Sequence, residues 1–391
     1  RRGRAAGAAI GRGKRDDGQQ LSKMILVRIL DFVLGTALAA YTFLSAARTY
    51  VVPRSHANVL SGIVFRTLRR IFGMIARRLP TYEQRDGLMA VYAPLSLLLL
   101  VPFWLLLTAV GFAMIYWAMG ITPWQNAFIA SGSSLLTLGY ATSDSFLFHL
   151  LSFSEAVIGL MLVAMLIAYL PTMYSAFAKR EAAVSLLQIR AGVPPTAPEL
   201  LWRLHSLDYD AQDIKAFWRT WEEWFFEIDE NHTSLAPLVF FRSPRPGLSW
   251  VVSAGVVLDG AALTLSLVEN ADSSSTVVLP AGIMTLRHIV DFFELPYDAD
   301  PHYPQVPIGV TREEFDAACE RLEMQGLTLK ADRDLAWQNY AGWRVNYAEL
   351  LAILSNLTMA PEVPWLSEYT MVRADPDSGE TGARLVKAHE V

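Results

Sequence analysis

Two carboxylates and a short polar segment stand out in an otherwise uncharged part of the chain. Asp144 and Glu155 are the only charged residues among the 92 from Gly87 to Ala178, and Thr137-Leu138-Gly139-Tyr140-Ala141 lies in the middle of that stretch. A carboxylate inside a bilayer is costly and marks a functional site by default. Non-helical backbone at that depth must be buried in protein or line a water-filled cavity. The pattern indicates a membrane pore with an ion-binding loop.

The segments on either side of this loop are long enough to cross a bilayer, which takes about 20 helical residues. Leu95–Met119 has no charge, and Leu151–Ala178 has only Glu155 and stops at Lys179-Arg180. Arginines also precede the first segment. Because basic flanks stay on the cytoplasmic side, we expect a helical hairpin whose connection, Gly120–Leu150, faces outside.

That connection is predicted to contain a helix too short to span, over Trp124–Leu136. Thr122 is expected to cap its start and Pro123 to take the first helical position, where a missing N–H costs nothing. The negative end of the helix dipole then points to the Thr137 loop and favours a cation there.

The loop resembles the TVGYG filter of tetrameric potassium channels, and its surroundings resemble that family's outer, pore and inner helices over roughly Ala90–Arg180. The resemblance implies four subunits around one axis and potassium ions that are dehydrated by filter oxygens. It assigns these oxygens to the carbonyls of Thr137, Leu138, Gly139 and Tyr140 and to the Thr137 hydroxyl. Ala141 is then the fifth filter residue, and Trp124 is expected at the filter support or mouth.

Two departures from the family pattern affect the outer end of the filter. Ala141 stands where the family has Gly, and Thr142 and Ser143 come before the acid, Asp144. If the outer residue needs a positive φ, Ala costs on the order of 1 kcal/mol or more relative to Gly. We expect potassium to be preferred, with weakened selectivity or a non-conducting filter as alternatives. Asp144 is expected at the mouth, where it raises the local cation concentration.

Three residues of the second apolar segment are candidates for filter support or gating. Glu155 either braces the filter by accepting hydrogen bonds from Tyr140 or backbone amides, or lies at the interface in contact with water. Gly159 is either a hinge or, more in keeping with membrane helices, a close-packing position. Pro171 is the better kink candidate because it removes a helical hydrogen bond.

Two further segments precede the pore region. Residues 24–53 are predicted to form a first transmembrane helix, and the basic residues 1–23 a disordered extension with Met24 as the natural start. Residues 57–80 alternate apolar and basic side chains and predict an amphipathic helix in the membrane interface. Its arginines are expected to contact anionic lipids rather than to sense voltage: Arg66, Arg69, Arg70, Arg77 and Arg78.

The remainder of the chain, residues 179–391, has a different character from the pore domain over 88–178. Its net charge is −14, against +9 for residues 1–178, which predicts a cytoplasmic domain. Helical patterns over Pro198–Leu207, Ala211–Asp229, Thr311–Gln325 and Tyr347–Leu357 favour an all-helical regulatory domain with an unknown ligand. Thr311 and Glu314 form a capping-box pattern.

This domain carries no recognisable chemical signature. Gly255 and Gly260 do not complete a dinucleotide-binding motif, the histidines lack ligand spacing, and Cys319 is the single cysteine. The apolar run Trp250–Val268 challenges the topology, because it is nearly as apolar as a span. We expect it to be a buried soluble element, since polar and Gly residues interrupt it and no basic flank marks it.

Together these patterns predict an all-α membrane protein: a potassium-channel-like pore, one N-terminal transmembrane helix and a mostly helical cytoplasmic domain. We expect a homotetrameric cation channel in the plasma membrane, gated by the cytoplasmic domain, with potassium as the bound ion and no nucleic-acid partner. A membrane enzyme would need a nucleophile or an acid–base pair at membrane depth. Apart from Glu155, this sequence offers none there. A non-conducting or weakly selective sensor or scaffold with a degenerate filter remains the alternative.

Overall fold

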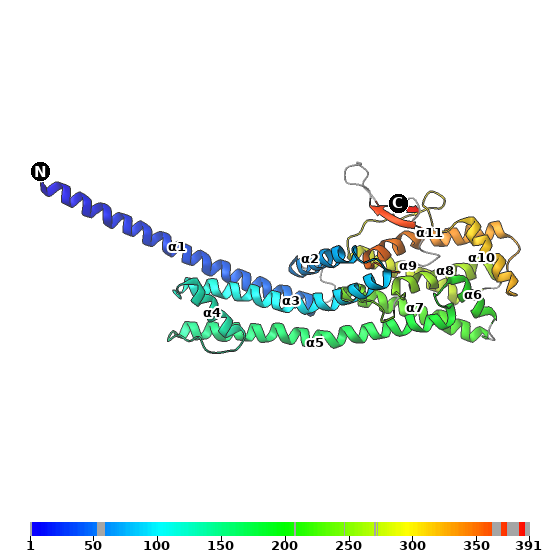
Figure 1. Ribbon diagram of the computed structural model, residues 1–391, viewed down its shortest axis with the longest axis horizontal. Helices are drawn as coiled ribbons and strands as arrows, with labels where there is room; N and C mark the ends of the chain where they lie inside the picture. The colour runs from blue at the N-terminus through cyan, green and yellow to red at the C-terminus, as the bar shows by residue number, and fades with distance from the viewer. Residues whose placement is uncertain are drawn as a thin grey trace. The chain divides into compact units, whose positions relative to one another are not determined.

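The protein is built almost entirely of helices (Figure 1). The computed structural model describes the backbone of residues 2–52, 59–206, 209–245, 247–269, 271, 273–361, 369–373 and 383–387, and among these the side chains from residue 20 to 361 except 21. The elements are α1 (Arg2–Tyr50), α2 (Val59–Ala76), α3 (Tyr82–Ala118), α4 (Trp124–Leu135), α5 (Phe146–Ala191), α6 (Ala197–Ser206), α7 (Ala211–Ser234), η1 (Ala236–Phe240), α8 (Trp250–Leu267), α9 (Ser274–Phe292), α10 (Arg312–Met324), α11 (Arg333–Thr358), β1 (Tyr369–Arg373) and β2 (Ala383–Lys387).

The chain divides into two compact units. Unit 1 comprises Arg1–Leu68 and Leu95–Pro171, and unit 2 comprises Arg69–Pro94 and Thr172–Val391. The second boundary falls at Pro171, the predicted kink position inside α5.

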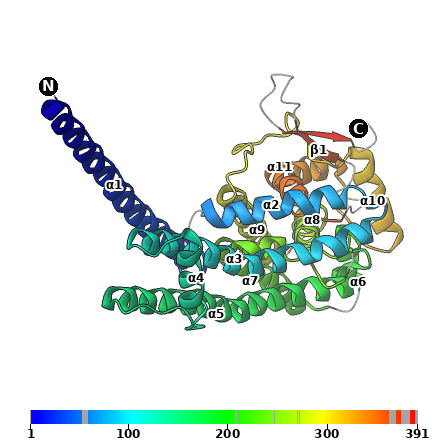
Figure 2. The same ribbon diagram turned by 60° about the vertical axis from the view of Figure 1, so that its left-hand side comes forward.

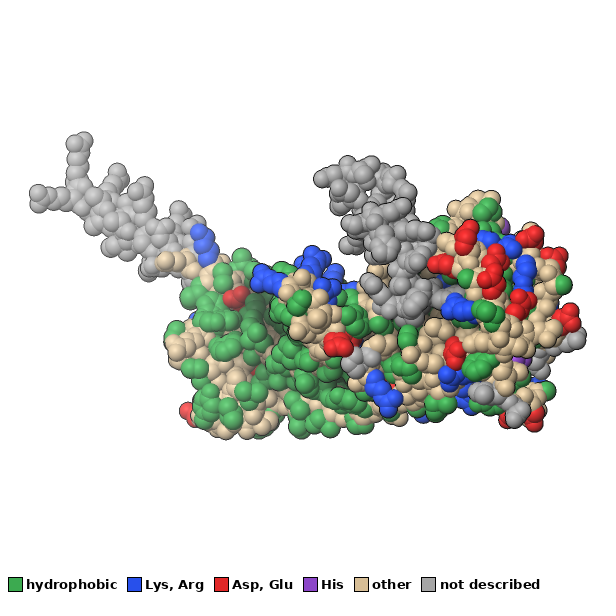
Figure 3. Space-filling view, turned by 45° about the vertical axis from the view of Figure 1, so that its right-hand side comes forward, with side chains coloured by type: hydrophobic (Ala, Val, Ile, Leu, Met, Phe, Trp, Pro, Cys, Tyr) green, Lys and Arg blue, Asp and Glu red, His purple; other side chains and the backbone are tan. Residues whose placement is uncertain are grey.

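Four helices in the described part of the chain are long and apolar enough to cross a membrane. They are Ser22–Tyr50 of α1, all of α3, all of α5, and α8. The chain is therefore a multi-pass membrane protein by the length and composition of its helices. In unit 1, apolar side chains cover most of the face seen in Figure 3. On α5, large apolar side chains are exposed at Phe153, Val157, Leu160 and Ile167.

Two helices are longer than the sequence predicts. α1 begins at Arg2, so the disorder predicted for residues 1–23 is wrong for the described backbone. Ala, Arg, Lys and Gln are good helix formers and continue the helix despite the intervening Gly residues. α5 runs without a break through Lys179 and Arg180 to Ala191, so the predicted boundary at 178 lies inside a helix.

Unit 1 brings α1, α3, α4 and α5 together. α3 and α5 run side by side, and α4 lies at their ends in both ribbon views (Figures 1 and 2). Glycines allow α1 and α3 to approach closely, because a Cβ on Gly35 would lie 2.5 Å from the Gly111 carbonyl oxygen. The Tyr50 ring packs at 5.2 Å from Trp104 and at 4.8 Å from Tyr169, which joins α1 to α3 and α5.

Unit 2 is a helical bundle with α8 in its core. α8 is buried on nearly all sides, and the helices α6, α9 and α11 pack against it. This confirms that Trp250–Val268 is buried, as predicted. Asp259 of α8 is buried and pairs with Arg344 of α11, while the Tyr347 hydroxyl donates to Asp259 Oδ1 at 2.7 Å. The polar residue that interrupts the apolar run thus fixes the register between α8 and α11.

The remaining predictions for this unit have mixed outcomes. The capping box of Thr311 and Glu314 is confirmed, and α6 lies within one residue of its predicted range. α7 begins at Ala211 as predicted but continues past Asp229 to Ser234. α11 is much longer than the predicted Tyr347–Leu357, and α9 was not predicted. β1 and β2 pair antiparallel, with Met371 opposite Leu385, so the domain is not purely helical.

Candidate functional site

α4 is the element that positions the candidate ion-binding loop. It begins at Trp124, as predicted, but Pro123 is the N-cap and no side chain caps the first turn, so the cap predicted for Thr122 is wrong. The Asn126 side chain instead donates to the Thr122 carbonyl oxygen at 3.2 Å. Trp124 lies at the opposite end of a helix about 18 Å long from the loop. It therefore does not support the filter segment of its own chain.

The end of α4 turns sharply into the loop. The amide of Thr137 donates to the Ser134 carbonyl at 3.0 Å, and the amide of Leu138 donates to the Ser133 carbonyl at 2.8 Å. These two bonds are a Schellman motif, in which the residue after the C-cap adopts a left-handed conformation. That residue is Thr137, at φ 56°, a strained position for a β-branched side chain.

The loop then stays bound to Ser133. The Gly139 amide donates to the Ser133 carbonyl at 3.2 Å, and the amides of Tyr140 and Ala141 each donate to Ser133 Oγ at 3.0 Å. Five successive amides, from Thr137 to Ala141, therefore turn back toward α4. In a planar trans peptide the C=O points opposite to the N–H. The carbonyl oxygens of residues 136–140 consequently point away from α4.

The side chains of this loop are exposed, at 60% for Leu138 and 63% for Tyr140. The Thr137 hydroxyl donates to the Leu136 carbonyl at 2.8 Å. Gly139 has φ 71°, whereas Ala141 is not among the described residues with a positive φ. The backbone penalty expected for Ala141 therefore does not arise, because this conformation suits any L-residue.

Glu155 is fully buried and joins three helices. The Tyr116 hydroxyl of α3 donates to Glu155 Oε2 at 2.8 Å, and the Ser131 hydroxyl of α4 lies in hydrogen-bond contact with Oε1. Both predictions for this residue are wrong: among the described residues its partners are neither Tyr140 nor backbone amides, and its side chain is buried rather than exposed at an interface. Glu155 lies on the face of α5 that packs against the body of α4 rather than against the loop.

The same face of α5 makes two more contacts with α4. Ser152 Oγ lies 2.7 Å from Ser134 Oγ, and a Cβ on Gly159 would lie 2.4 Å from the Leu135 carbonyl oxygen. Ser152, Glu155 and Gly159 follow helical spacing and share one side of α5. The geometry of Gly159 is that of the close-packing alternative.

Sequence reasoning missed three residues of this site: Tyr116, Ser131 and Ser133. The available signal was the group of serines in α4, which are buried in an otherwise apolar helix. A buried hydroxyl needs partners, and Ser133 Oγ uses its acceptor capacity on two loop amides. Asp144 is exposed in the segment between the loop and α5.

Arg69 does not belong to the set of exposed arginines predicted for the membrane interface. Its Nη2 donates to the Leu357 carbonyl at 2.7 Å, and its guanidinium lies 5.5 Å from the centre of the Phe240 ring. Burial lowers the pKa of Arg69. Arg66, Arg70, Arg77 and Arg78 are exposed.

Arg180, predicted as a basic flank of the membrane span, is also buried. It pairs with Glu181 at 2.8 Å and donates to the carbonyls of Leu238 and Phe241 at 2.8 and 2.6 Å. It therefore binds the last part of α5 to its neighbours within unit 2. Lys179 keeps an exposed side chain.

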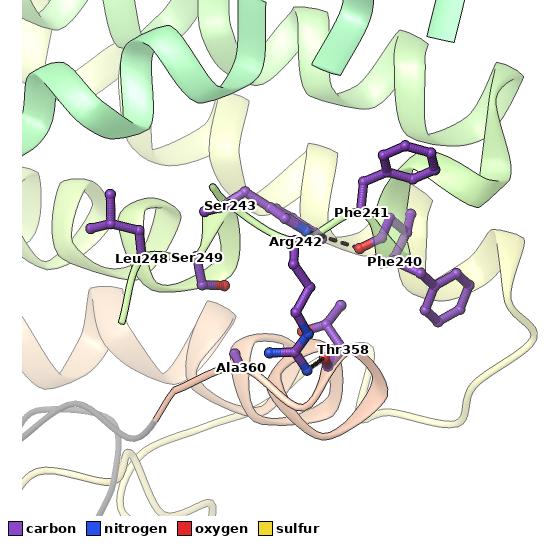
Figure 4. A pocket seen from close by; sticks show the side chains of 10 residues that line it. Phe240, Phe241, Arg242, Ser243, Leu248, Ser249, Thr358 and Ala360 are labelled. Atoms are coloured by element: carbon purple, nitrogen blue, oxygen red, sulfur yellow. Dashed lines mark hydrogen bonds between the residues drawn. The ribbon is translucent and has the colours of Figure 1, made fainter. Parts of the chain in front are cut away.

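A small pocket in unit 2 surrounds Arg242 (Figure 4). Its volume of about 20 Å³ is enough for a single water molecule. The guanidinium contacts Asp86 and donates to the carbonyls of Thr358 and Met359 at 2.7 and 2.8 Å. Arg242 thus links the start of α3 to the end of α11. The pocket beside it is too small to hold the regulatory ligand that the sequence predicts.

The site therefore consists of a loop with outward-turned carbonyls, the serines of α4 that hold it, and the buried carboxyl that ties α4 to α3 and α5. In comparisons with protein-family models, curated proteins and solved structures, nothing matches this chain.

Proposed function

We propose that this protein is a tetrameric cation channel that prefers potassium, with its filter at Thr137–Ala141. The observation that carries the proposal is the set of five successive amides that turn toward α4. The carbonyl oxygens at the opposite ends of those peptides then point away from α4, on the free side of the loop. In several copies around an axis, such oxygens are the ligands that replace the hydration shell of a permeating cation.

Charge and position support a cation rather than an anion. The loop follows the C-terminus of α4, where the helix dipole is negative. Asp144 adds a negative charge close by in the chain. One chain supplies oxygens on one side only, so enclosing an ion takes several copies around an axis, and we propose four.

The proposal extends to the rest of the chain in outline. We infer transport rather than catalysis, a plasma-membrane location, a cytoplasmic residue range 179–391, and gating through that domain. The continuous helix α5, which belongs to both units, supports mechanical coupling between the two.

A non-conducting or weakly selective sensor or scaffold is the second candidate. The observation that favours it is the hydrogen bond from the Thr137 hydroxyl to the Leu136 carbonyl oxygen, which occupies part of the acceptor capacity of one outward-turned oxygen. Ala141 in the fifth position adds a difference from the potassium-channel filter.

The test is the reversal potential of the purified chain in planar bilayers across a potassium/sodium gradient, together with the cross-linked oligomer size. We expect a tetramer and a reversal potential shifted toward that of potassium. Current without that shift would indicate a non-selective pore. A monomeric chain that carries no current would contradict the channel proposal.

Gly139→Ala is the matching variant, because a Cβ at φ 71° is strained by roughly 1–2 kcal/mol. We expect it to reduce selectivity or abolish current. Gly132→Ala is the control, since Gly132 lies inside α4 and a Cβ there meets nothing within 4 Å. Equal behaviour of the two variants would show that the loop conformation is irrelevant to conduction.

A further inference from the structure

The second half of α2 exposes large apolar side chains that no element of the described chain covers. Ile71, Met74 and Ile75 are 41%, 60% and 46% exposed. These three residues follow the i, i+3, i+4 spacing of a single helix face, and Arg78 lies in the turn that follows the helix. Arg70 and Arg77 are exposed beside that face. These six residues form the α2 patch.

The opposite side of the same helix is fixed against unit 2. Phe72 is buried and its ring packs 5.9 Å from that of Tyr92, and Ala76 is 1% exposed. Arg69 is tied to the end of α11 through the Leu357 carbonyl. Because these contacts set the rotation of the helix, the α2 patch faces outward and does not rotate inward to bury its own apolar groups.

The composition of the α2 patch fits a bilayer surface. A helix that lies in the headgroup region buries apolar side chains at the acyl boundary and directs Lys or Arg to anionic lipids. Three apolar and three arginine side chains within nine residues meet both requirements. An anionic surface would repel acidic side chains. Most of the acidic side chains seen in Figure 3 lie at the right-hand end of that view.

The position of the α2 patch in the chain favours lipid over a protein partner. Only residues 77–81 separate α2 from α3, a helix with the length and composition of a membrane span. Five residues reach at most about 18 Å. The α2 patch is therefore followed closely in the chain by a helix that can span a bilayer.

We propose that the α2 patch docks on an anionic membrane surface, with Ile71, Met74 and Ile75 at the acyl boundary and Arg70, Arg77 and Arg78 among the headgroups. Arg69, which lies beside them in the sequence, binds the protein instead, through the Leu357 carbonyl and the Phe240 ring. This surface does not depend on ion conduction, so the inference stands apart from the proposed function.

The test uses a fluorophore on the full-length chain in lipid vesicles. Cys319 is buried, and burial raises the pKa of its thiol to about 11, so it stays unlabelled at neutral pH. A label is placed by Met74→Cys and, as the matched control, by Met324→Cys, since Met324 is 79% exposed at the end of α10. Vesicles contain phosphatidylcholine with or without phosphatidylglycerol, and the quenchers are doxyl-labelled lipid and aqueous iodide.

We expect the Met74→Cys label in phosphatidylglycerol vesicles to be quenched by the doxyl lipid and to be several-fold less sensitive to iodide than the Met324→Cys label. Arg70→Gln, Arg77→Gln and Arg78→Gln together should reduce the doxyl quenching. Equal iodide quenching at the two sites would overturn the proposal. Protection from iodide without doxyl quenching would also overturn it, because protein would then cover the α2 patch. Doxyl quenching that is the same with and without phosphatidylglycerol would refute the anionic preference.

Discussion

Two buried carboxylates, Glu155 in unit 1 and Asp259 in unit 2, are stabilised in different ways. Asp259 pairs with the guanidinium of Arg344 and accepts from the Tyr347 hydroxyl. Burial alone lowers the pKa of Arg344, but the adjacent Asp259 raises it overall, so the cation is retained. Glu155 contacts hydroxyls, those of Tyr116 and Ser131, and forms no ion pair within the described residues.

The hydrogen bonds of Ser131 bear on whether Glu155 carries a proton. The Ser131 hydroxyl has one proton and two neighbours that accept it, the Ala109 carbonyl at 3.0 Å and Glu155 Oε1. If Ser131 donates to Ala109, Glu155 must supply the proton of the second bond as a neutral acid. The carboxylate of unit 2 is thus an ion that a cation compensates, and the carboxyl of unit 1 is part of a hydroxyl network. We infer that charge matters at Asp259 and that shape and hydrogen bonding matter at Glu155.

The largest expected effect is at Asp259. Asp259→Asn leaves the Arg344 cation buried without its counter-charge, which costs about 3–5 kcal/mol of the free energy of unfolding. Chemical unfolding of the purified chain, or its yield, measures the loss. The double variant Asp259→Leu with Arg344→Met should recover most of it, because an apolar pair of similar volume replaces the ions. A loss below about 1 kcal/mol in the single variant would mean that the ion pair is not needed.

Ser133→Ala should have an intermediate effect, confined to unit 1. It removes the acceptor of the Tyr140 and Ala141 amides, each of which then lacks a bond worth roughly 1 kcal/mol. For the proposed channel, we expect the potassium-to-sodium permeability ratio to fall while the cross-linked size stays that of the unchanged chain. Ser154→Ala is the control, since Ser154 is exposed and its hydroxyl bonds only to the Leu150 carbonyl of its own helix among the described contacts. An unchanged potassium-to-sodium permeability ratio in Ser133→Ala would show that these two loop hydrogen bonds do not control selectivity.

The smallest effect is expected for Glu155→Gln. The amide keeps the shape, accepts from Tyr116 and donates to Ser131, so the cost should stay below about 1 kcal/mol. Glu155→Ala removes both bonds and leaves two buried hydroxyls without this partner, which should cost more and lower the thermal stability of the purified chain. A thermal shift assay compares the two variants. If Glu155→Gln is as damaging as Asp259→Asn, the comparison fails and Glu155 acts as a charged group.

Local patterns were predictable from the sequence. The short helix α4 ends one residue from the predicted position, the capping box at Thr311 is present, and the apolar run of α8 is buried. These features depend on residues within one or two helical turns of each other, where capping and periodicity act. Glu155 was recognised for the same reason, because a lone acid in an apolar run is conspicuous.

Tertiary partners were not predictable in the same way. Tyr116 and Ser131 lie 39 and 24 residues from Glu155 in the chain, and Arg69 bonds to Leu357 across 288 residues. A basic residue near an apolar run reads as a membrane flank whether it meets lipid or, like Arg69 and Arg180, is buried against its own protein. Helix α9 has Pro280 in its interior, which argues against a helix on local grounds, yet tertiary packing stabilises it.

The left-handed conformation of Thr137 has a thermodynamic consequence for a multi-copy assembly. A non-glycine residue at φ 56° raises the energy of its loop by about 1–2 kcal/mol. Four identical loops around an axis would add to several kcal/mol, enough to change the ratio of two loop arrangements by more than a hundredfold. In the proposed tetramer, relaxation of this backbone angle in all copies together would make the loops a cooperative, two-position element instead of a fixed ring.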